Sequence, residues 1–148
     1  MSSRITKQVN RMVRHLALGL GVLMCTAPAW AQGVIKIGEI NSYKAQPAFL
    51  EPYKKGMELA LEEINAAGGV NGRKLQLFIR DDNATPGDAV RAAEELMTRE
   101  QVDVLSGTFL SHVGLAVADL ARQRKMFFLA GEPLTDKIVW QNGNRYTF

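Results

Sequence analysis

Short apolar segments and longer segments of helical periodicity alternate along the chain, and this alternation restricts the fold more than any other feature of the sequence. The four predicted strands are 33–40, 74–80, 102–107 and 125–131. Strands separated by helices need crossover connections, which place the helices on the faces of a parallel sheet. The sequence therefore predicts an α/β fold with a doubly wound parallel sheet. Because crossovers are right-handed, the strand order 2-1-3-4-5 is the leading topology.

Three predicted helices separate these strands, and each has recognisable start or stop signals. Apolar residues recur every three or four positions over 50–64, and the glycines of "AAGGVNG" suit the left-handed end of that helix. Thr85 is the predicted N-cap of the second helix, with Pro86 at its first position and Asp88 where a carboxylate suits the helix dipole. The third helix is predicted to begin at Ser111.

The last four residues, "RYTF", have the character of the beginning of a fifth strand. Neither a closing helix nor a polar tail follows them, although a domain that ends its sheet usually continues into one or the other. We therefore expect the chain to be a fragment that is truncated in or near strand five.

The N-terminal 31 residues have the pattern of a secretory signal peptide. Residues 1–15 carry four basic side chains and no acidic one, and "LALGLGVLM" is an apolar run too short to cross a bilayer as a helix. "AWA", which ends at Ala31, is a small-x-small cleavage site. We expect cleavage after Ala31, export to the periplasm, and one mature domain over 32–148.

Cleavage would change the charge and the cysteine content of the chain. The net charge is +3 from 18 basic and 15 acidic residues, and loss of the four basic residues leaves 14 against 15, or −1. A basic surface for nucleic acid or a membrane is therefore not expected. The single cysteine, Cys25, would also leave with the signal peptide, so the mature domain has no disulfide or thiol chemistry.

Ser111 follows the third predicted strand and has three competing interpretations. It suits a helix N-cap without a ligand. As a nucleophile it would need a base within reach and a G-x-S-x-G turn, which "FLSHV" does not match. As a ligand anchor it would lie at the crevice between strands one and three, where the strand order reverses and free amides at the helix start attract an anion.

The segment from Val34 to Phe148 resembles the branched-chain amino-acid substrate-binding proteins of ABC transporters, the leucine/isoleucine/valine-binding type. The motifs that carry the resemblance are "AAGGVNGRKL" and "DDNATPGDAV" within "GMELALEEINAAGGVNGRKLQLFIRDDNATPGDAVRAAEELM". The resemblance implies two α/β lobes joined by a hinge, with a ligand held in the cleft between them. It covers the first half or less of a typical member, so 32–148 is expected to be an incomplete N-terminal lobe.

The resemblance also assigns candidate ligand-binding residues. Ser111 falls on the serine that binds the ligand carboxylate, and Phe109 on a cleft-lining position. In the loop after strand four, Glu132 and Leu134 take the positions that in the family offer a carbonyl to the ammonium and a hydroxyl to the carboxylate. Both depart from the family pattern, because Leu134 can offer only its backbone N–H and Glu132 is a carboxylate in place of a small residue. Tyr43 lies in "NSYKAQPAF", which replaces a Gly-Pro-rich segment of the family. Tyr43, Phe109 and Glu132 together suit an aromatic acid, an amide or an amine-bearing compound.

The function that this resemblance implies is the periplasmic binding of amino acids or related compounds for import. The expected partners are a small-molecule ligand and an inner-membrane ABC permease, with no nucleic acid, and the full-length form is expected to be a monomer. No enzyme activity, cofactor or metal is expected, and Asp81-Asp82 is assigned to turn and cap roles rather than to Mg²⁺. The alternatives are a periplasmic ligand sensor or regulator built on the same lobe and, less favoured, an exported α/β enzyme.

Overall fold

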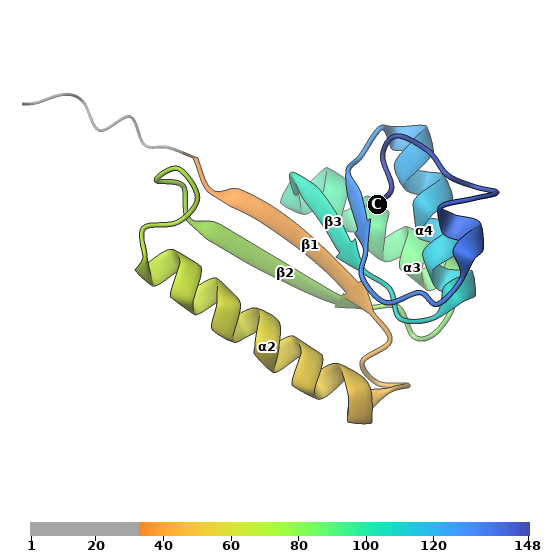
Figure 1. Cartoon of the computed structure of the whole chain (residues 1–148), viewed down its shortest axis with the longest axis horizontal. Helices are drawn as coiled ribbons and strands as arrows, with labels where there is room; N and C mark the ends of the chain where they lie inside the picture. Colours follow the sequence, from red (N-terminus) through yellow and green to blue (C-terminus); the bar gives the residue numbers. More distant parts are fainter. Residues whose placement is uncertain (1–32) are drawn as a thin grey trace, which may run out of the picture. The chain divides into compact units, whose positions relative to one another are not determined.

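The computed structural model describes residues 33–148, so the predicted signal peptide lies outside the described residues. Four parallel strands form one sheet in the order β2-β1-β3-β4 (Figure 1). Their bounds are β1 Ile35–Asn41, β2 Leu75–Asp81, β3 Val104–Gly107 and β4 Phe128–Ala130. The predicted doubly wound order is confirmed. Residues 146–148 hydrogen-bond alongside β4, in the position predicted for the fifth strand, and form an isolated parallel bridge there.

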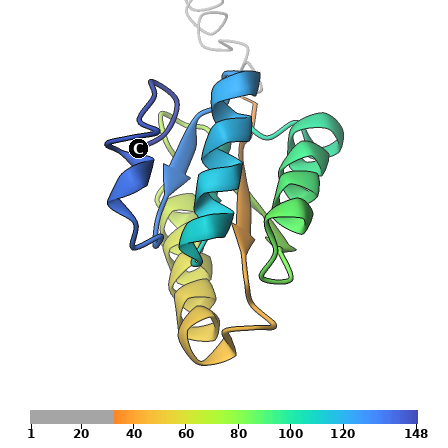
Figure 2. The same ribbon diagram turned by 90° about the vertical axis from the view of Figure 1, so that its right-hand side faces the viewer.

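Helices cover both faces of this sheet, as Figures 1 and 2 show from two sides. The helices are α2 Pro47–Ala66, α3 Pro86–Glu95, which continues into the π-helical turn η1 Leu96–Glu100, α4 Ser111–Arg124, and the short 3-10 turn η2 Asp136–Ile138. Helix α2 begins at Pro47, three residues before the predicted position. Proline is tolerated there because the first turn of a helix does not use the backbone N–H that proline lacks. Among the described helices, none has the length and apolar character to cross a membrane.

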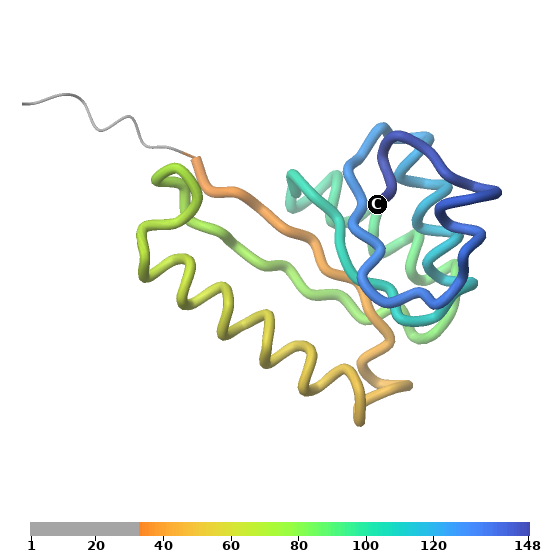
Figure 3. Tube along the Cα trace, viewed as in Figure 1, coloured from red at the N-terminus to blue at the C-terminus, as the bar shows by residue number. Residues whose placement is uncertain are grey.

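The hydrophobic core lies between the sheet and the pair α3–α4. Ile40, Leu105 and Phe128 point into it from β1, β3 and β4, and each is fully buried. The opposite face of the sheet is covered only in part, by α2, which lies over one side of it (Figure 3). Of the residues of α2, only Leu50 is completely buried. A cavity of about 340 Å³ remains between α2 and the strands on that face, and Leu129 of β4 is 49% exposed.

Local signals explain where the helices begin and end. The Thr85 side chain accepts a hydrogen bond from the Asp88 amide at 3.3 Å, so the predicted N-cap is confirmed. Gln101 is the C-cap of the π-helical turn after α3 and Lys125 is the C-cap of α4, and each has the left-handed backbone conformation. Lys125, placed by the sequence pattern in strand four, is therefore the C-cap of α4, and β4 begins three residues later.

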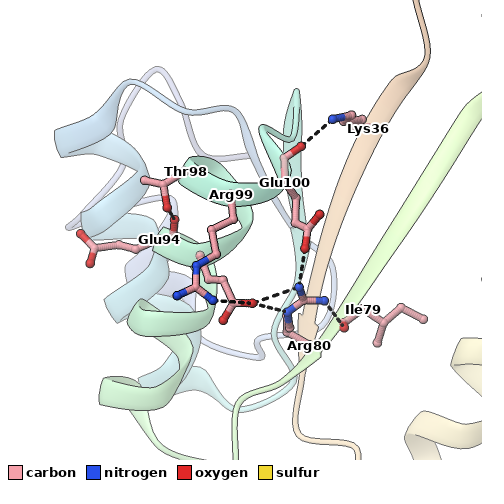
Figure 4. Close-up of polar contacts among 8 residues, drawn as sticks. Lys36, Ile79, Arg80, Glu94, Thr98, Arg99 and Glu100 are labelled. Atoms are coloured by element: carbon pink, nitrogen blue, oxygen red, sulfur yellow. Dashed lines mark hydrogen bonds and ion pairs between the residues drawn. The ribbon is translucent and has the colours of Figure 1, made fainter.

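Arg80 of β2 joins the sheet to the end of α3 and the π-helical turn (Figure 4). Its guanidinium donates to Glu95 at 3.1 Å and to Glu100 at 2.8 Å, and also to the carbonyl of Ile79 at 3.1 Å. Lys36 of β1 donates to the Glu100 carbonyl at 2.7 Å. These partly buried contacts hold the turn after α3 against strands β1 and β2.

Replacement of Arg80 by methionine is expected to lower the free energy of unfolding by about 1–2 kcal/mol, because two carboxylates lose a partly buried, charged hydrogen-bond donor while the aliphatic stem is retained. The matched control is Arg91→Met, because the Arg91 side chain is 75% exposed where it pairs with Asp88. Urea unfolding of both variants measures the difference. Equal stability of the two would show that the Arg80 contacts contribute no more than a surface ion pair.

Candidate functional site

Three loops meet at the carboxyl edge of the sheet, because β1, β3 and β4 are neighbours and run in the same direction. The Thr108 amide after β3 donates to the carbonyl of Ile40 at 2.7 Å, and the Gly131 amide after β4 donates to the carbonyl of Gly107 at 3.0 Å. Such edges are where open α/β sheets bind ligands. The predicted site residues all follow one of these three strands.

Ser111 is the first helical residue of α4, and the N-cap is Leu110, whose backbone is extended (φ −81°, ψ 131°). The Leu110 carbonyl accepts the first helical hydrogen bond, from the Gly114 amide at 2.9 Å. The interpretation of Ser111 as an N-cap is therefore wrong by one position. Amides in the first turn of a helix have no intrahelical partner, and they carry the positive end of the helix dipole. The hydroxyl of half-buried Ser111 and these amides form a set of donors suited to an anionic group.

Phe109 stacks on Phe49 from the first turn of α2, with ring centroids 5.8 Å apart and an interplanar angle of 23°. The family resemblance indicates Phe109 as a site residue but not its partner Phe49, because 60 residues separate the two rings in the chain. Phe49 remains 63% exposed. The pair presents an aromatic surface between the loop after β3 and the start of α2.

Four polar side chains form what we call the acceptor network: Glu39, Asn41, Tyr43 and Glu132. The Tyr43 hydroxyl donates to Glu39 Oε2 at 2.6 Å. The Asn41 side-chain amide donates to Glu39 Oε1 at 3.2 Å and to Glu132 Oε2 at 3.3 Å. The network thus connects two predicted site residues, Tyr43 and Glu132, through two residues that the sequence analysis missed.

Glu39 is completely buried in the middle of the sheet. Its backbone pairs with Ile79 on β2 and with Ser106 on β3. Gly107 leaves room for the carboxylate, since a Cβ at that position would lie 2.6 Å from Glu39 Oε1. A glutamate inside a strand that the predicted order places between two other strands was the signal in the sequence that could have identified it.

Burial raises the pKa of Glu39 from its usual 4.5 to about 7. The hydrogen bonds from Tyr43 and Asn41 oppose this rise, while the negative charges of Glu132 and Asp82 add to it. Burial also raises the pKa of Tyr53, on α2, to about 12, with smaller contributions from Glu39 and Glu132. A carboxyl group that changes charge near neutral pH therefore lies directly beneath the loops of the site.

Glu132 and Leu134 lie on the loop after β4, which packs against the start of α4. The approach is close, because a Cβ on Gly114 would lie 2.7 Å from the Pro133 ring. Glu132 is half-buried and joins the acceptor network, whereas the Leu134 side chain is 96% exposed. The structure therefore connects Glu132 to Tyr43 through Asn41 and Glu39, and it leaves the Leu134 side chain outside the network.

Asp81 and Asp82 shape the turn after β2, as predicted. The Asp81 carboxylate accepts hydrogen bonds from the amides of Lys44 and Asn83, at 2.9 and 2.8 Å. Buried Asp82 accepts from the Ser42 hydroxyl at 2.6 Å, and burial raises its pKa. These contacts attach the loop that carries Tyr43 to the loop after β2. Over residues 33–148, no three His, Cys, Asp or Glu side chains form a group that could hold a metal ion.

The carboxyl edge therefore carries donors at the start of α4, acceptors around Glu132, and the aromatic pair Phe49–Phe109. Donors and acceptors in this arrangement suit a small molecule with an anionic group at one end and a cation or hydrogen-bond donor at the other. His112, which follows Ser111, is exposed. The site has the chemistry of recognition, with polar groups for orientation and aromatic surface for contact.

Comparison with known proteins gives a family match over the described residues. The family model described as periplasmic binding protein matches residues 34–148. A leucine/isoleucine/valine-binding protein homologue of Brucella suis is 36% identical over 125 residues, which cover 82% of this chain and 29% of the relative.

Solved structures of similar fold have bound ligands of two kinds. The branched-chain amino acid substrate-binding protein of Streptococcus pneumoniae, in complex with isoleucine, is 26% identical with a TM-score of 0.71, over 78% of this chain and 33% of that one. A solute-binding protein of Rhodopseudomonas palustris, in complex with benzoate, is 27% identical with a TM-score of 0.70, over 78% and 32%. The chain thus spans about a third of the length of the relatives that it matches.

Proposed function

Because this chain belongs to the periplasmic binding protein family, in its leucine/isoleucine/valine-binding type, we propose that it is the substrate-binding component of an ABC importer for amino acids or related small compounds, including amides and aromatic acids. In this proposal, residues 32–148 provide the N-terminal lobe of the binding protein. Its partners are the small-molecule ligand and an inner-membrane ABC permease. Residues 1–31 act as a cleavable signal peptide that directs the protein to the periplasm. The mature protein binds its ligand without transforming it.

The observation that carries this proposal is the placement of Ser111 and Glu132 on neighbouring loops at one edge of the sheet. Ser111 begins α4 and offers a hydroxyl with the free amides of the first turn. Glu132 reaches the same edge from the loop after β4 and is held there by Asn41. A carboxylate bound at Ser111 would leave the opposite end of the ligand near acceptors. Isoleucine and benzoate, the ligands of two structural relatives, both have a carboxylate, which is consistent with a site that binds an anionic group at the start of α4.

The test is a titration of the full chain, labelled with ¹⁵N, by L-leucine and by benzoate. We expect amide shifts to concentrate at the start of α4 and in the loop after β4. The described residues supply one wall of a cleft, so the titration must extend to millimolar ligand. Absence of shifts at those amides with either compound, in a folded protein, would contradict the proposed function.

Ser111→Ala is expected to weaken ligand binding at least fivefold, because one hydrogen bond to a carboxylate contributes about 1–3 kcal/mol. The matched control is His112→Ala, which removes the exposed neighbouring side chain and leaves the hydroxyl in place. The dissociation constants of both variants come from the same titration. Unchanged affinity after loss of the Ser111 hydroxyl would show that the backbone amides alone hold the ligand or that the ligand lies elsewhere.

A further inference from the structure

We propose that Glu39 is the positioning residue of this site: while ionised, its carboxylate holds the Tyr43 phenol and, through Asn41, the Glu132 carboxylate in the geometry that receives a cationic or hydrogen-bond-donating group of the ligand. This inference rests on the proposed function for its ligand and on the structure alone for its contacts. Glu39 itself is completely buried, so it acts on the ligand through Tyr43 and Glu132.

The contacts of Glu39 reach all three loops of the site. Tyr43, which donates to Glu39 at 2.6 Å, belongs to the loop after β1. Asn41 donates at once to Glu39 and to Glu132 of the loop after β4. Gly107, whose missing side chain leaves room for the carboxylate, precedes the loop after β3. A change at Glu39 therefore reaches the loop after β1 directly through Tyr43 and the loop after β4 through Asn41, and it acts on the carboxyl end of β3 at Gly107.

The surroundings make the charge of Glu39 sensitive to pH. The titratable groups around it are Tyr43 after β1, Tyr53 on α2, Asp82 after β2 and Glu132 after β4, while the neighbouring part of β3 contributes Ser106 and Gly107. Burial and the nearby carboxylates raise the pKa of Glu39 to about 7. Protonation replaces two charge-assisted hydrogen bonds by weaker neutral ones, so the positions of Tyr43 and Glu132 become less restricted.

This arrangement predicts a selectivity that depends on pH. A ligand with an ammonium or another donor group benefits from the ionised network, whereas a simple carboxylic acid without such a group gains nothing from it. With a pKa near 7, the ionised fraction of Glu39 falls from about nine-tenths at pH 8 to about one-tenth at pH 6. If only the ionised form is competent, the apparent affinity for a zwitterion falls about tenfold over this interval.

The first test needs no ligand. In the full chain, NMR signals of the Tyr43 ring and of the Asn41 side-chain amide are expected to move together with a midpoint near pH 7. Glu39→Gln removes this titration, and Glu58→Gln, at an exposed position on α2, leaves it unchanged. Tyr43→Phe raises the midpoint reported by Asn41, because the lost hydrogen bond favoured the ionised form. A Tyr43 signal that does not titrate, or that titrates in the Glu39→Gln variant, would overturn the proposal.

The second test measures the effect on ligands, with L-leucine as the zwitterionic probe and benzoate as the probe without a donor group. We expect the L-leucine dissociation constant to rise about tenfold from pH 8 to pH 6 in the wild type and to stay constant in Glu39→Gln. A constant value in the wild type would overturn the selectivity. Failure of both probes to bind at any pH contradicts the proposed function and the ligand half of this inference. In that case the first test alone decides whether the ionisation of Glu39 controls its hydrogen bonds with Tyr43 and Asn41.

Discussion

Replacement of Gly107 by alanine is expected to destabilise the domain by about 3–5 kcal/mol. Gly107 ends β3 with φ of +104°, a conformation that L-residues rarely adopt. An added Cβ would lie 2.4 Å from the carbonyl oxygen of Ile40 and 2.6 Å from Glu39 Oε1. Both neighbours are buried in the adjacent strand, so the methyl group can be accommodated only by moving β1 away from β3.

Urea unfolding followed by circular dichroism measures this effect, and Gly87→Ala is the matched control. Gly87 lies in α3, and a Cβ there would meet no atom within 4 Å. Because alanine favours a helix over glycine, the control is expected to be neutral or to stabilise the domain by up to about 1 kcal/mol. Similar stabilities of the two variants would show that β1 and β3 are not as closely packed around Gly107 as the structure indicates.

Glu39→Gln is expected to make the domain more stable than the wild type at pH 8. The difference in free energy of unfolding between the two proteins is expected to be about 3 kcal/mol larger at pH 8 than at pH 4.5. Glu39 has a pKa of about 7 in the folded protein, and its ordinary value is 4.5. Between these values the folded state binds more protons than the unfolded state, so the stability of the wild type falls as pH rises. The contribution of neutral Glu39 is fully present below pH 4.5 and is lost as pH rises through 7. Glutamine remains neutral throughout, and a shift of about 2.5 units corresponds to about 3 kcal/mol.

The measurement is the free energy of unfolding of both proteins at intervals from pH 4.5 to pH 8.5. Asp82, whose pKa is also raised, is present in both and cancels in the difference. The control is Asp119→Asn on α4, where hydrogen bonds from Arg122 and Gln123 lower the pKa of an exposed carboxyl group. The stability that ionised Asp119 contributes is lost only in acid. The difference in free energy of unfolding between Asp119→Asn and the wild type is therefore expected to stay constant above pH 5. A constant difference for Glu39→Gln as well would mean that Glu39 is already ionised throughout this range.

Much of the architecture follows from local sequence patterns. Alternation of strands and helices predicted the parallel order, and the cap at Thr85 marked the start of α3. These features depend on residues close together in the chain, where periodicity and capping act directly. Where a local pattern allowed neighbouring positions, as at Ser111 or Lys125, the prediction was displaced by one to three residues. The backbone conformation that decides such a boundary depends on how the helix packs.

The candidate site divides in the same way. The sequence by itself determined which loops follow which strands, and therefore that Tyr43, Ser111 and Glu132 lie at one edge of the sheet. Only the tertiary structure decided that Glu39 connects Tyr43 to Glu132 through Asn41, and that Phe109 stacks on Phe49. Alternation along a strand shows to which side a side chain points, but not which groups from other strands and helices surround it. Those groups set the burial of Glu39, and burial is the largest cause of its raised pKa.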